Sequence, residues 1–213
     1  MLDTNAARER ASALVERALR AGADAADAVY SGEVSEGVQV RLGQLEEVER
    51  SEDEHIGLRV FTGESSASIG SSDLGDAALE ELAARAVSMA RLAPEDQYAG
   101  LAPQDMLATG AGLDLDQVDP CEPSPQDLRA IAEEAEDAAR AVAGVTNSEG
   151  GGASAGRSVF ALATSHGFAR GYESTSHGRS ASVIAGEGAG MQRDYAWRSA
   201  RHLGDLPSAE EIG

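Results

Sequence analysis

The period of the hydrophobic pattern changes early in the chain, and this change restricts the fold more than any other feature. Over residues 5–20 the apolar positions recur every three or four residues, which predicts an amphipathic helix with Asp3 or Thr4 as its N-cap. Apolar and polar residues then alternate, as over 38–42 and 56–60, which is typical of strands that keep one polar face. A helix followed by a run of strands favours an α+β fold.

The strand-like segments fall into two groups along the chain. The first group predicts four or five consecutive antiparallel strands, at 26–31, 38–42, 45–48, 56–60 and 66–69. The second group predicts another antiparallel meander, at 159–163, 167–173, 181–185 and 192–197. We therefore expect an antiparallel sheet, or two, with a polar face open to solvent or to a partner.

Two further helices are predicted between these groups. One runs from Asp73 to about residue 92, and the other begins with Ser124 as N-cap and Pro125 at the first helical position and ends near residue 142. Between them, residues 93–124 are irregular and rich in proline, and a loop of this length is often functional or ordered by a partner. About three helices should therefore pack on the strands.

The last eight residues have the pattern of a helix start. Ser208 is placed as an N-cap, and Glu211 follows three positions later, which is the arrangement of a capping box. We therefore expect residues 1–205 to form an N-terminal α+β domain. Residues 206–213 should begin a linker helix toward a C-terminal domain that this sequence lacks.

The charge of the chain restricts the classes of partner that it can bind. The sequence has 37 acidic residues against 17 basic ones, all of them arginine, and its formal net charge is −20. Because phosphate backbones are bound through basic side chains, this balance disfavours direct DNA or RNA binding and favours basic partners. The single cysteine excludes an internal disulfide and fits a reducing cytosol. No apolar run spans a membrane and the start lacks a signal-peptide pattern, so we expect a cytoplasmic protein without a membrane partner.

Few residues of this sequence suggest a catalytic or metal-binding role. The four histidines, His55, His166, His177 and His202, have neither the HExxH pattern nor the i, i+4 spacing of a helical metal site. His166 and His177 bracket a predicted strand pair and could meet across a hairpin, but solvated turn histidines are the preferred interpretation. Cys121 has acidic neighbours on both sides, which disfavour the thiolate that a nucleophile needs.

Two other patterns also have an unremarkable interpretation. The glycine-rich segments 148–152 and 186–190 lack the residues of a phosphate-binding loop, so they are read as flexible turns or as a place for close approach of an extended peptide. The acidic run 46–54 could bind cations, but it lacks an EF-hand pattern and is interpreted as a solvated strand edge. From the residues alone, no catalytic, metal-binding or cofactor-binding residue is predicted in this chain.

A set of short motifs extends over nearly the whole chain: VQVR at 38–41, GLRVF at 57–61, SSDL at 71–74, AVSMA at 86–90, PEDQYAGL at 94–101, NSEG at 147–150, TSHGF at 164–168, MQRDY at 191–195 and EIG at 211–213. Together they resemble the N-terminal half of the TldD/PmbA proteins, also called the modulator-of-DNA-gyrase family. The details are more similar to the PmbA (TldE) branch than to TldD.

This resemblance implies a zinc-dependent peptidase assembly in which TldD-type and PmbA-type subunits pair and act on unfolded or peptide substrates. Family roles include maturation of a peptide microcin and degradation of an antitoxin. In the family the TldD-type subunit carries an HExxxH helix and a later cysteine as zinc ligands, all in its C-terminal half, whereas the PmbA branch generally lacks them. No catalytic or metal residue is therefore transferred to this chain, and zinc is expected in the C-terminal half of a TldD-type partner.

Three functions follow as hypotheses. In the first, the chain helps to wall a substrate channel and forms part of the interface with a TldD-type subunit or a second copy, because an exposed sheet edge can accept an extended peptide. The second is a non-catalytic peptide-binding or regulatory module, of the gyrase-modulator type. The third is direct modulation of gyrase on DNA, against which the net charge argues. An HExxxH motif after Gly213 would favour a catalytic subunit over a supporting one.

Overall fold

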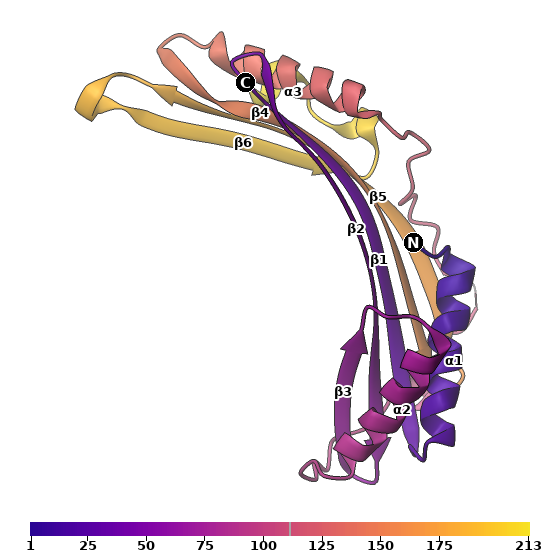
Figure 1. Ribbon diagram of the computed structural model, residues 1–213. Helices are drawn as coiled ribbons and strands as arrows, with labels where there is room; N and C mark the ends of the chain where they lie inside the picture. Colours follow the sequence, from indigo (N-terminus) through magenta and orange to yellow (C-terminus); the bar gives the residue numbers. More distant parts are fainter. Residues whose placement is uncertain (111) are drawn as a thin grey trace. The chain divides into compact units, whose positions relative to one another are not determined.

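The computed structural model describes residues 1–110 and 112–213 and confirms an α+β fold (Figure 1). Its helices are α1 (Thr4–Arg20), α2 (Asp76–Ala90), α3 (Pro125–Arg140) and α4 (Ala209–Ile212). Its strands are β1 (Ala25–Arg41), β2 (Gln44–Thr62), β3 (Ser65–Ser71), β4 (Val145–Thr164), β5 (Ala169–Ala185) and β6 (Gln192–Ala200). Three short 3-10 turns lie at Gln104–Met106, Gly188–Gly190 and Leu203–Asp205.

The two predicted meanders join into one sheet with the strand order β3-β2-β1-β4-β5-β6. The join lies between β1 and β4, which run antiparallel, since Gly150 lies against the carbonyl of Val40 whereas Gly156 lies against that of Val34. The β1–β2 hairpin turns at Leu42 and Gly43, with φ angles of 50° and 72°. Positive φ at both positions is the signature of a type I′ turn, whose twist matches that of the flanking strands.

The predicted number of strands in the first half was wrong. The segments 26–31 and 38–42 both belong to β1, and 45–48 and 56–60 both belong to β2, so three strands, two of them long, replace the expected four or five. The intervening residues 49–55 of β2 are mostly polar and exposed, and residues 32–37 of β1 are mostly half-buried, yet both stretches continue the strand. Pairing with a neighbouring strand keeps them extended, and this does not require an apolar face.

The predicted helix starts at Asp3 and Ser124 were confirmed, whereas the predicted start at Asp73 was wrong. Asp3 caps α1 by accepting a hydrogen bond from the amide of Ala6 at 2.8 Å, and Ser124 forms a full capping box with Asp127. The second helix begins three residues later than predicted, because Asp73 instead accepts the amide of Gly75 in a turn before the helix.

Contacts within the chain define two compact units. Unit 1 contains Met1–Glu33, Asp53–Asp114 and Ser158–Glu173; unit 2 contains Val34–Glu52, Leu115–Arg157 and Ser174–Gly213. Strands β1, β2, β4 and β5 therefore contribute residues to both units.

In unit 1, helices α1 and α2 pack against its strands. Alanine is the commonest residue of this core, which brings helix and sheet backbones close together, and Tyr30 is its largest fully buried side chain. Residues 93–124 are irregular, as predicted, apart from one 3-10 turn in the part that the structure describes. Hydrogen bonds hold part of this segment in unit 1: His166 donates to the carbonyl of Ala102 at 3.0 Å, and Arg170 donates to that of Ala108 at 3.2 Å.

In unit 2, helix α3 packs on the sheet through two small clusters of buried residues: Val38, Val40, Leu128, Ala132 and Ala153 in one, and Ala135, Ala139, Ala181 and Ile212 in the other. The second cluster includes the chain's last helical residue. As predicted, Ser208 caps α4, accepting the amide of Glu211 at 3.2 Å. Because Ile212 is buried against α3, this segment is a packed part of unit 2.

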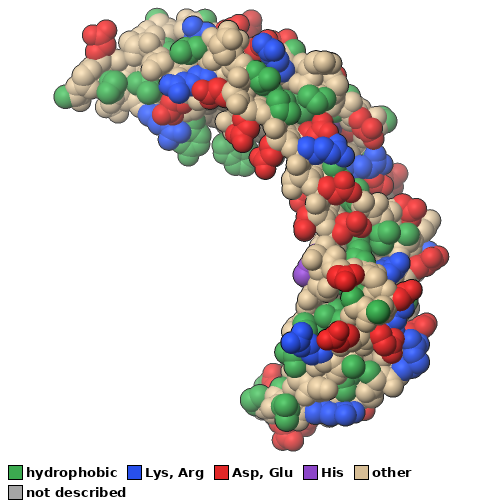
Figure 2. All heavy atoms as spheres, in the orientation of Figure 1, with side chains coloured by type: hydrophobic (Ala, Val, Ile, Leu, Met, Phe, Trp, Pro, Cys, Tyr) green, Lys and Arg blue, Asp and Glu red, His purple; other side chains and the backbone are tan. Residues whose placement is uncertain are grey.

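The surface carries many charges of both signs. On the face drawn in Figure 2, acidic and basic side chains are interspersed. Of the helices in the described part of the chain, none has both the length and the apolar character needed to cross a membrane.

Candidate functional site

The sheet of unit 2 has one face under α3 and one face without a helix. On β4, Gly151 faces α3, since a Cβ atom there would lie only 2.2 Å from the carbonyl oxygen of Ala132, and Ala153 is buried in the same contact. Successive strand residues point to opposite faces. Gly152 and Ser154 therefore lie on the face away from α3, which we call the open face.

The same alternation shows which residues of β5 lie on each face of the sheet. The side chain of Arg179 donates to the carbonyl of Pro207 at 2.9 Å and Ala181 is buried against α3, so both lie on the covered face. Ser180 and Ser182 therefore lie on the open face.

The open face also carries two aromatic rings from β6. Trp197 pairs opposite Ser180, and Tyr195 pairs opposite Ser182. Residues directly opposite each other in a sheet share a face. Both rings are largely solvent-exposed, at 62% for Trp197 and 64% for Tyr195.

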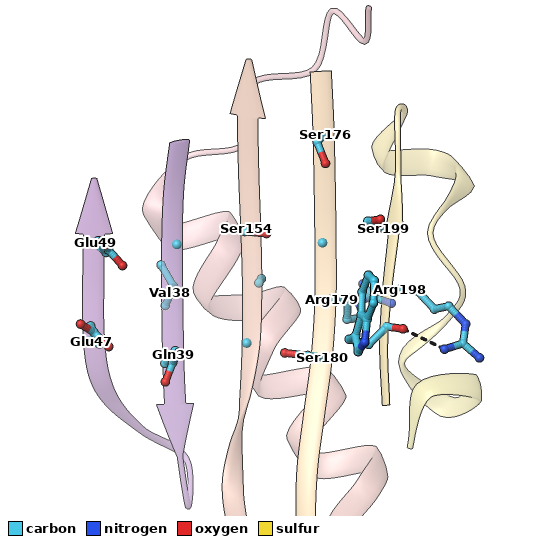
Figure 3. Close-up of a pocket in the computed structure, with 15 residues that line it drawn as sticks. Val38, Gln39, Glu47, Glu49, Ser154, Ser176, Arg179, Ser180, Arg198 and Ser199 are labelled. Atoms are coloured by element: carbon cyan, nitrogen blue, oxygen red, sulfur yellow. Dashed lines mark hydrogen bonds between the residues drawn. The ribbon is translucent and has the colours of Figure 1, made fainter. Parts of the chain in front are cut away.

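A cavity of about 380 Å³ lies on this face, across five neighbouring strands. Figure 3 shows Glu47 and Glu49 of β2 at one side and Arg198 and Ser199 of β6 at the other. An adjoining cavity of about 350 Å³ shares several of these residues and extends to Tyr195 and Arg193. We call the two together the open groove. Its first cavity is lined by Gly37, Val38, Gln39, Glu47, Glu49, Gly152, Ala153, Ser154, Ser176, Gly178, Arg179, Ser180, Trp197, Arg198 and Ser199.

The floor of the open groove is made of glycine and serine. A Cβ atom at Gly152 would lie 2.7 Å from the hydroxyl of Ser180, and one at Gly178 would lie 2.6 Å from the hydroxyl of Ser154. The serine side chains therefore lie over the neighbouring glycines. Such a floor presents hydroxyl groups and lets another chain come close to the sheet.

A bulge at Gly150 shapes one end of the groove. Ser148 and Gly151 both face α3, whereas Glu149 lies on the open face beside Gly152, so the alternation shifts by one residue between them. Gly150 has a φ of +122°, and a Cβ atom there would lie 2.6 Å from a carbonyl oxygen of β1. A bulge with glycine at this position is one way in which sheets redirect a side chain.

Glu149 thereby joins three strands on the open face. It accepts a hydrogen bond from Ser182 at 2.8 Å and is paired with Arg193, whose guanidinium lies 5.7 Å from the ring centre of Tyr195. The hydrogen bond from Ser182 and then that from Arg193 hold the pKa of Glu149 below its ordinary value. The charge of Arg193 is therefore balanced within the groove.

On the covered face, Glu136 of α3 is fully buried and was not singled out from the sequence. Its carboxylate accepts hydrogen bonds from the amides of Leu42 at 2.7 Å and Gly43 at 3.0 Å. It also accepts one from the hydroxyl of Ser148. Burial raises the pKa of Glu136, but the hydrogen bonds from Ser148, Gly43 and Leu42 outweigh it, and the net shift is downward. One side chain thus fixes the hairpin turn and the bulge that border the groove.

A sequence signal for Glu136 exists. The apolar stripe of α3 runs through Leu128, Ala132, Ala135 and Ala139, and residue 136 falls within it. An acidic residue in such a stripe is buried and needs partners. Its partners lie in segments that are distant in the sequence or in a different element. The sequence therefore indicates that residue 136 is buried but does not identify the groups that it binds.

The unpaired edges of the sheet flank this face. β3 pairs only with residues 56–62 of β2, so the outer side of 44–55 has no strand beside it in the described structure. The acidic run 46–54 lies along this edge and is exposed for nearly all of its length, which confirms its interpretation as a solvated strand edge. β6 forms the opposite edge.

The interpretation of His177 as a solvated turn residue was wrong. It lies within β5 at 2% exposure, with its Nε2 3.3 Å from a carboxylate oxygen of Asp119. It does not meet His166, which lies in unit 1 and binds the carbonyl of Ala102. The physical reason is that the hairpin turn comes before residue 169, so that His177 lies well inside the strand.

Asp119 organises the end of the long loop in unit 2. Its carboxylate accepts hydrogen bonds from the amides of Leu203 at 2.6 Å and Cys121 at 2.9 Å. These two hydrogen bonds hold the pKa of Asp119 below its ordinary value. Nearby, His202 donates to the carbonyl of Asp116 at 2.9 Å, which raises the pKa of the imidazole. These hydrogen bonds hold the end of the loop in place within unit 2.

The described residues do not fit a zinc site. Among them, no group of three or more His, Cys, Asp and Glu side chains is placed to hold a metal ion. Cys121 is exposed, and His55 lies over Gly70 in unit 1.

Comparison with known protein families identifies the family to which the chain belongs. Residues 26–90 match the first domain of the PmbA/TldA metallopeptidases, and residues 118–213 match their central domain. The chain belongs to the TldD/PmbA family. The expectation from its short motifs is thus confirmed.

Curated relatives agree. The chain is 36% identical to the metalloprotease PmbA of Escherichia coli O157:H7 over 191 residues, which are 89% of this chain and 42% of that protein. It is 31% identical to the PmbA homologue of Haemophilus influenzae over 209 residues, which are 97% of this chain and 46% of that protein. The chain therefore spans less than half the length of these relatives.

Solved structures share the fold. A candidate modulator of DNA gyrase from Bacteroides thetaiotaomicron has a TM-score of 0.88 at 20% identity, covering 99% of this chain and 49% of that one. TldE from Thermococcus kodakarensis has a TM-score of 0.79 at 15% identity, covering 95% of this chain and 45% of that one.

Proposed function

We propose that this chain is the N-terminal part of a PmbA/TldE-type subunit in a zinc-dependent peptidase assembly that acts on unfolded or peptide substrates. In this proposal it contributes part of the substrate channel and of the subunit interface, and no catalytic residue. In this proposal residues 1–205 are the N-terminal domain, and residues 206–213, which pack on α3 in unit 2, are the start of a linker helix. Zinc belongs to the C-terminal half of a TldD-type partner.

The observation that carries the proposal is the open groove with Trp197 and Tyr195 exposed side by side on β6. Large aromatic rings that gather on a solvated sheet face are typical of surfaces that bind another chain. The glycine and serine floor suits an extended peptide, because backbone atoms can approach it and hydroxyls can bind amides of any sequence. Tolerance of sequence is what a peptidase for unfolded chains needs.

The unpaired edges support the interface part of the proposal. The outer sides of β6 and of residues 44–55 of β2 leave backbone groups available for another strand. The partner is a TldD-type subunit or a second copy of this protein. The net charge of −20 argues against nucleic acid as a direct partner, and the single cysteine supports a cytoplasmic location.

The test uses the full-length protein with a TldD-type partner. The double variant W197A/Y195A should reduce cleavage of an unstructured peptide by about tenfold or more without changing the zinc content of the complex. Y98A is the matched control, because Tyr98 is 84% exposed in unit 1, outside the open groove. Cleavage and subunit pairing at the wild-type level in W197A/Y195A would refute the proposal.

A further inference from the structure

We propose that the open groove selects extended segments that carry a cationic side chain and an aromatic or large apolar side chain about four to six residues apart. This inference rests on the proposed function, since it specifies the peptides that this groove binds. It follows from the different chemistry of the groove's two sides and from the distance between them.

One side is acidic. Glu47 and Glu49 lie two residues apart on β2, both are exposed, and both line the cavity (Figure 3). The neighbouring arginines are engaged elsewhere, Arg50 with Glu36 and Arg41 with the carbonyl of Ser148. In the described part of the chain, neither Glu47 nor Glu49 takes part in an ion pair.

No basic group of the groove offsets these two carboxylates. Arg179 lies on the covered face, near Glu134, and Arg193 is paired with Glu149. Arg198 points away from the cavity in Figure 3 and donates to a backbone carbonyl of its own strand. The β2 side of the groove therefore favours a cation, and the charge complementarity points to lysine or arginine in the bound segment.

The other side is aromatic. The exposed residue Trp197 lines both cavities. Tyr195, two residues earlier on β6, lines the second cavity. An indole face binds apolar and aromatic side chains and tolerates cationic ones. A bound segment that reaches both sides must cross the strands.

The spacing follows from sheet geometry. In unit 2 the strands β1, β4 and β5 lie between β2 and β6, so the two sides are four strand intervals apart. Neighbouring strands are about 4.8 Å apart, which gives roughly 19 Å, and an extended chain advances about 3.3 Å per residue. About six residues cover the distance, and the length of a lysine or arginine side chain reduces this to about four.

The experiment measures binding of three dye-labelled ten-residue peptides to the full chain by fluorescence anisotropy. Each peptide has phenylalanine at position 2 and differs only at positions 7 and 8, which are both Arg, both Gln or both Glu. Trp197 is the only tryptophan of the sequence, so its emission reports occupancy of the groove in parallel. We expect the Arg peptide to bind roughly fivefold more tightly than the Gln peptide at low salt, with the Glu peptide weakest.

The variant E47Q/E49Q should abolish this preference and leave the affinity for the Gln peptide unchanged. The control E133Q/D137N makes the same change in net charge on α3, on the covered side of the sheet, and should keep the preference. Moving the two arginines to positions 3 and 4, next to the phenylalanine, should also remove the advantage.

Other outcomes would overturn the inference in distinguishable ways. If all three peptides change the Trp197 emission with equal affinities, or if E47Q/E49Q keeps the preference, the charge selection is wrong while peptide binding at the groove stands. If no peptide changes the emission, the groove does not bind peptides and the proposed function fails with it. If only a TldD-type subunit or a second copy changes the emission, the groove is a subunit interface.

Discussion

Ser148 donates its hydroxyl hydrogen to the carboxylate of Glu136, and both residues are completely buried. This contact joins α3 to the strand segment whose bulge brings Glu149 to the open face. The covered face and the groove are therefore linked through one short stretch of β4, and we expect a change at Glu136 to alter the position of Glu149.

The first prediction concerns Glu136 itself. E136Q should lower the free energy of unfolding by about 2 kcal/mol, because an amide nitrogen would face donors that the carboxylate now satisfies. Urea denaturation checks this, with E133Q as the control, since Glu133 forms only an exposed pair with Arg129. Equal stability of the two variants would show that the buried network is not stabilising.

A second prediction concerns pH. The folded-state pKa of Glu136 lies below its unfolded value, so this group contributes stability above the unfolded pKa and loses it as the pH falls through the folded pKa. The free energy of unfolding should therefore decrease as the pH drops below about 4.5. Denaturant midpoints measured from pH 6 to pH 3 test this, and the decrease should be smaller in E136Q. A wild-type curve that stays flat over this range would contradict the assignment.

A third prediction concerns the contact between β4 and α3. G151A should destabilise the protein by about 2–3 kcal/mol, because the new methyl group would lie 2.2 Å from a backbone carbonyl of α3. G37A is the matched strand variant: nothing lies within 4 Å of its Cβ position, and it should change stability by less than about 0.5 kcal/mol. Thermal unfolding followed by circular dichroism distinguishes them, and a G151A protein as stable as G37A would show that α3 shifts freely.

A fourth prediction concerns the end of the chain. I212A should cost about 2 kcal/mol, since Ile212 is 7% exposed and packs against Ala135 and Ala139 of α3. M191A serves as the comparison, because Met191 is 56% exposed and outside this cluster. If amide exchange on α3 is equally slow in both variants, α4 does not stabilise the helix.

Local signals predicted much of this fold. Asp3, Ser124 and Ser208 were visible as helix caps because capping depends on residues only two or three positions away. The length of β1 and β2 was not visible, because pairing with neighbouring strands rather than local alternation keeps their middle residues extended.

The groove was less predictable for the same reason. Trp197 and Tyr195 share a face with Ser180 only through the register between β5 and β6, which the sequence does not reveal. His177 likewise lies beside Asp119, which is 58 residues earlier in the chain. The glycine-rich segment 148–152 was interpreted as a flexible turn or a place for close approach of an extended peptide, but it lies within β4, where Gly150 and Gly151 approach backbone atoms of this same chain.

The turn at Leu42 has a consequence for the order of folding. Leucine rarely adopts a φ of +50°, and here its amide is bound by Glu136, a residue 94 positions later in the chain. We therefore expect the tip of the first hairpin to need α3 for its completion. During synthesis, the hairpin tip should become ordered only once α3 has emerged and docked.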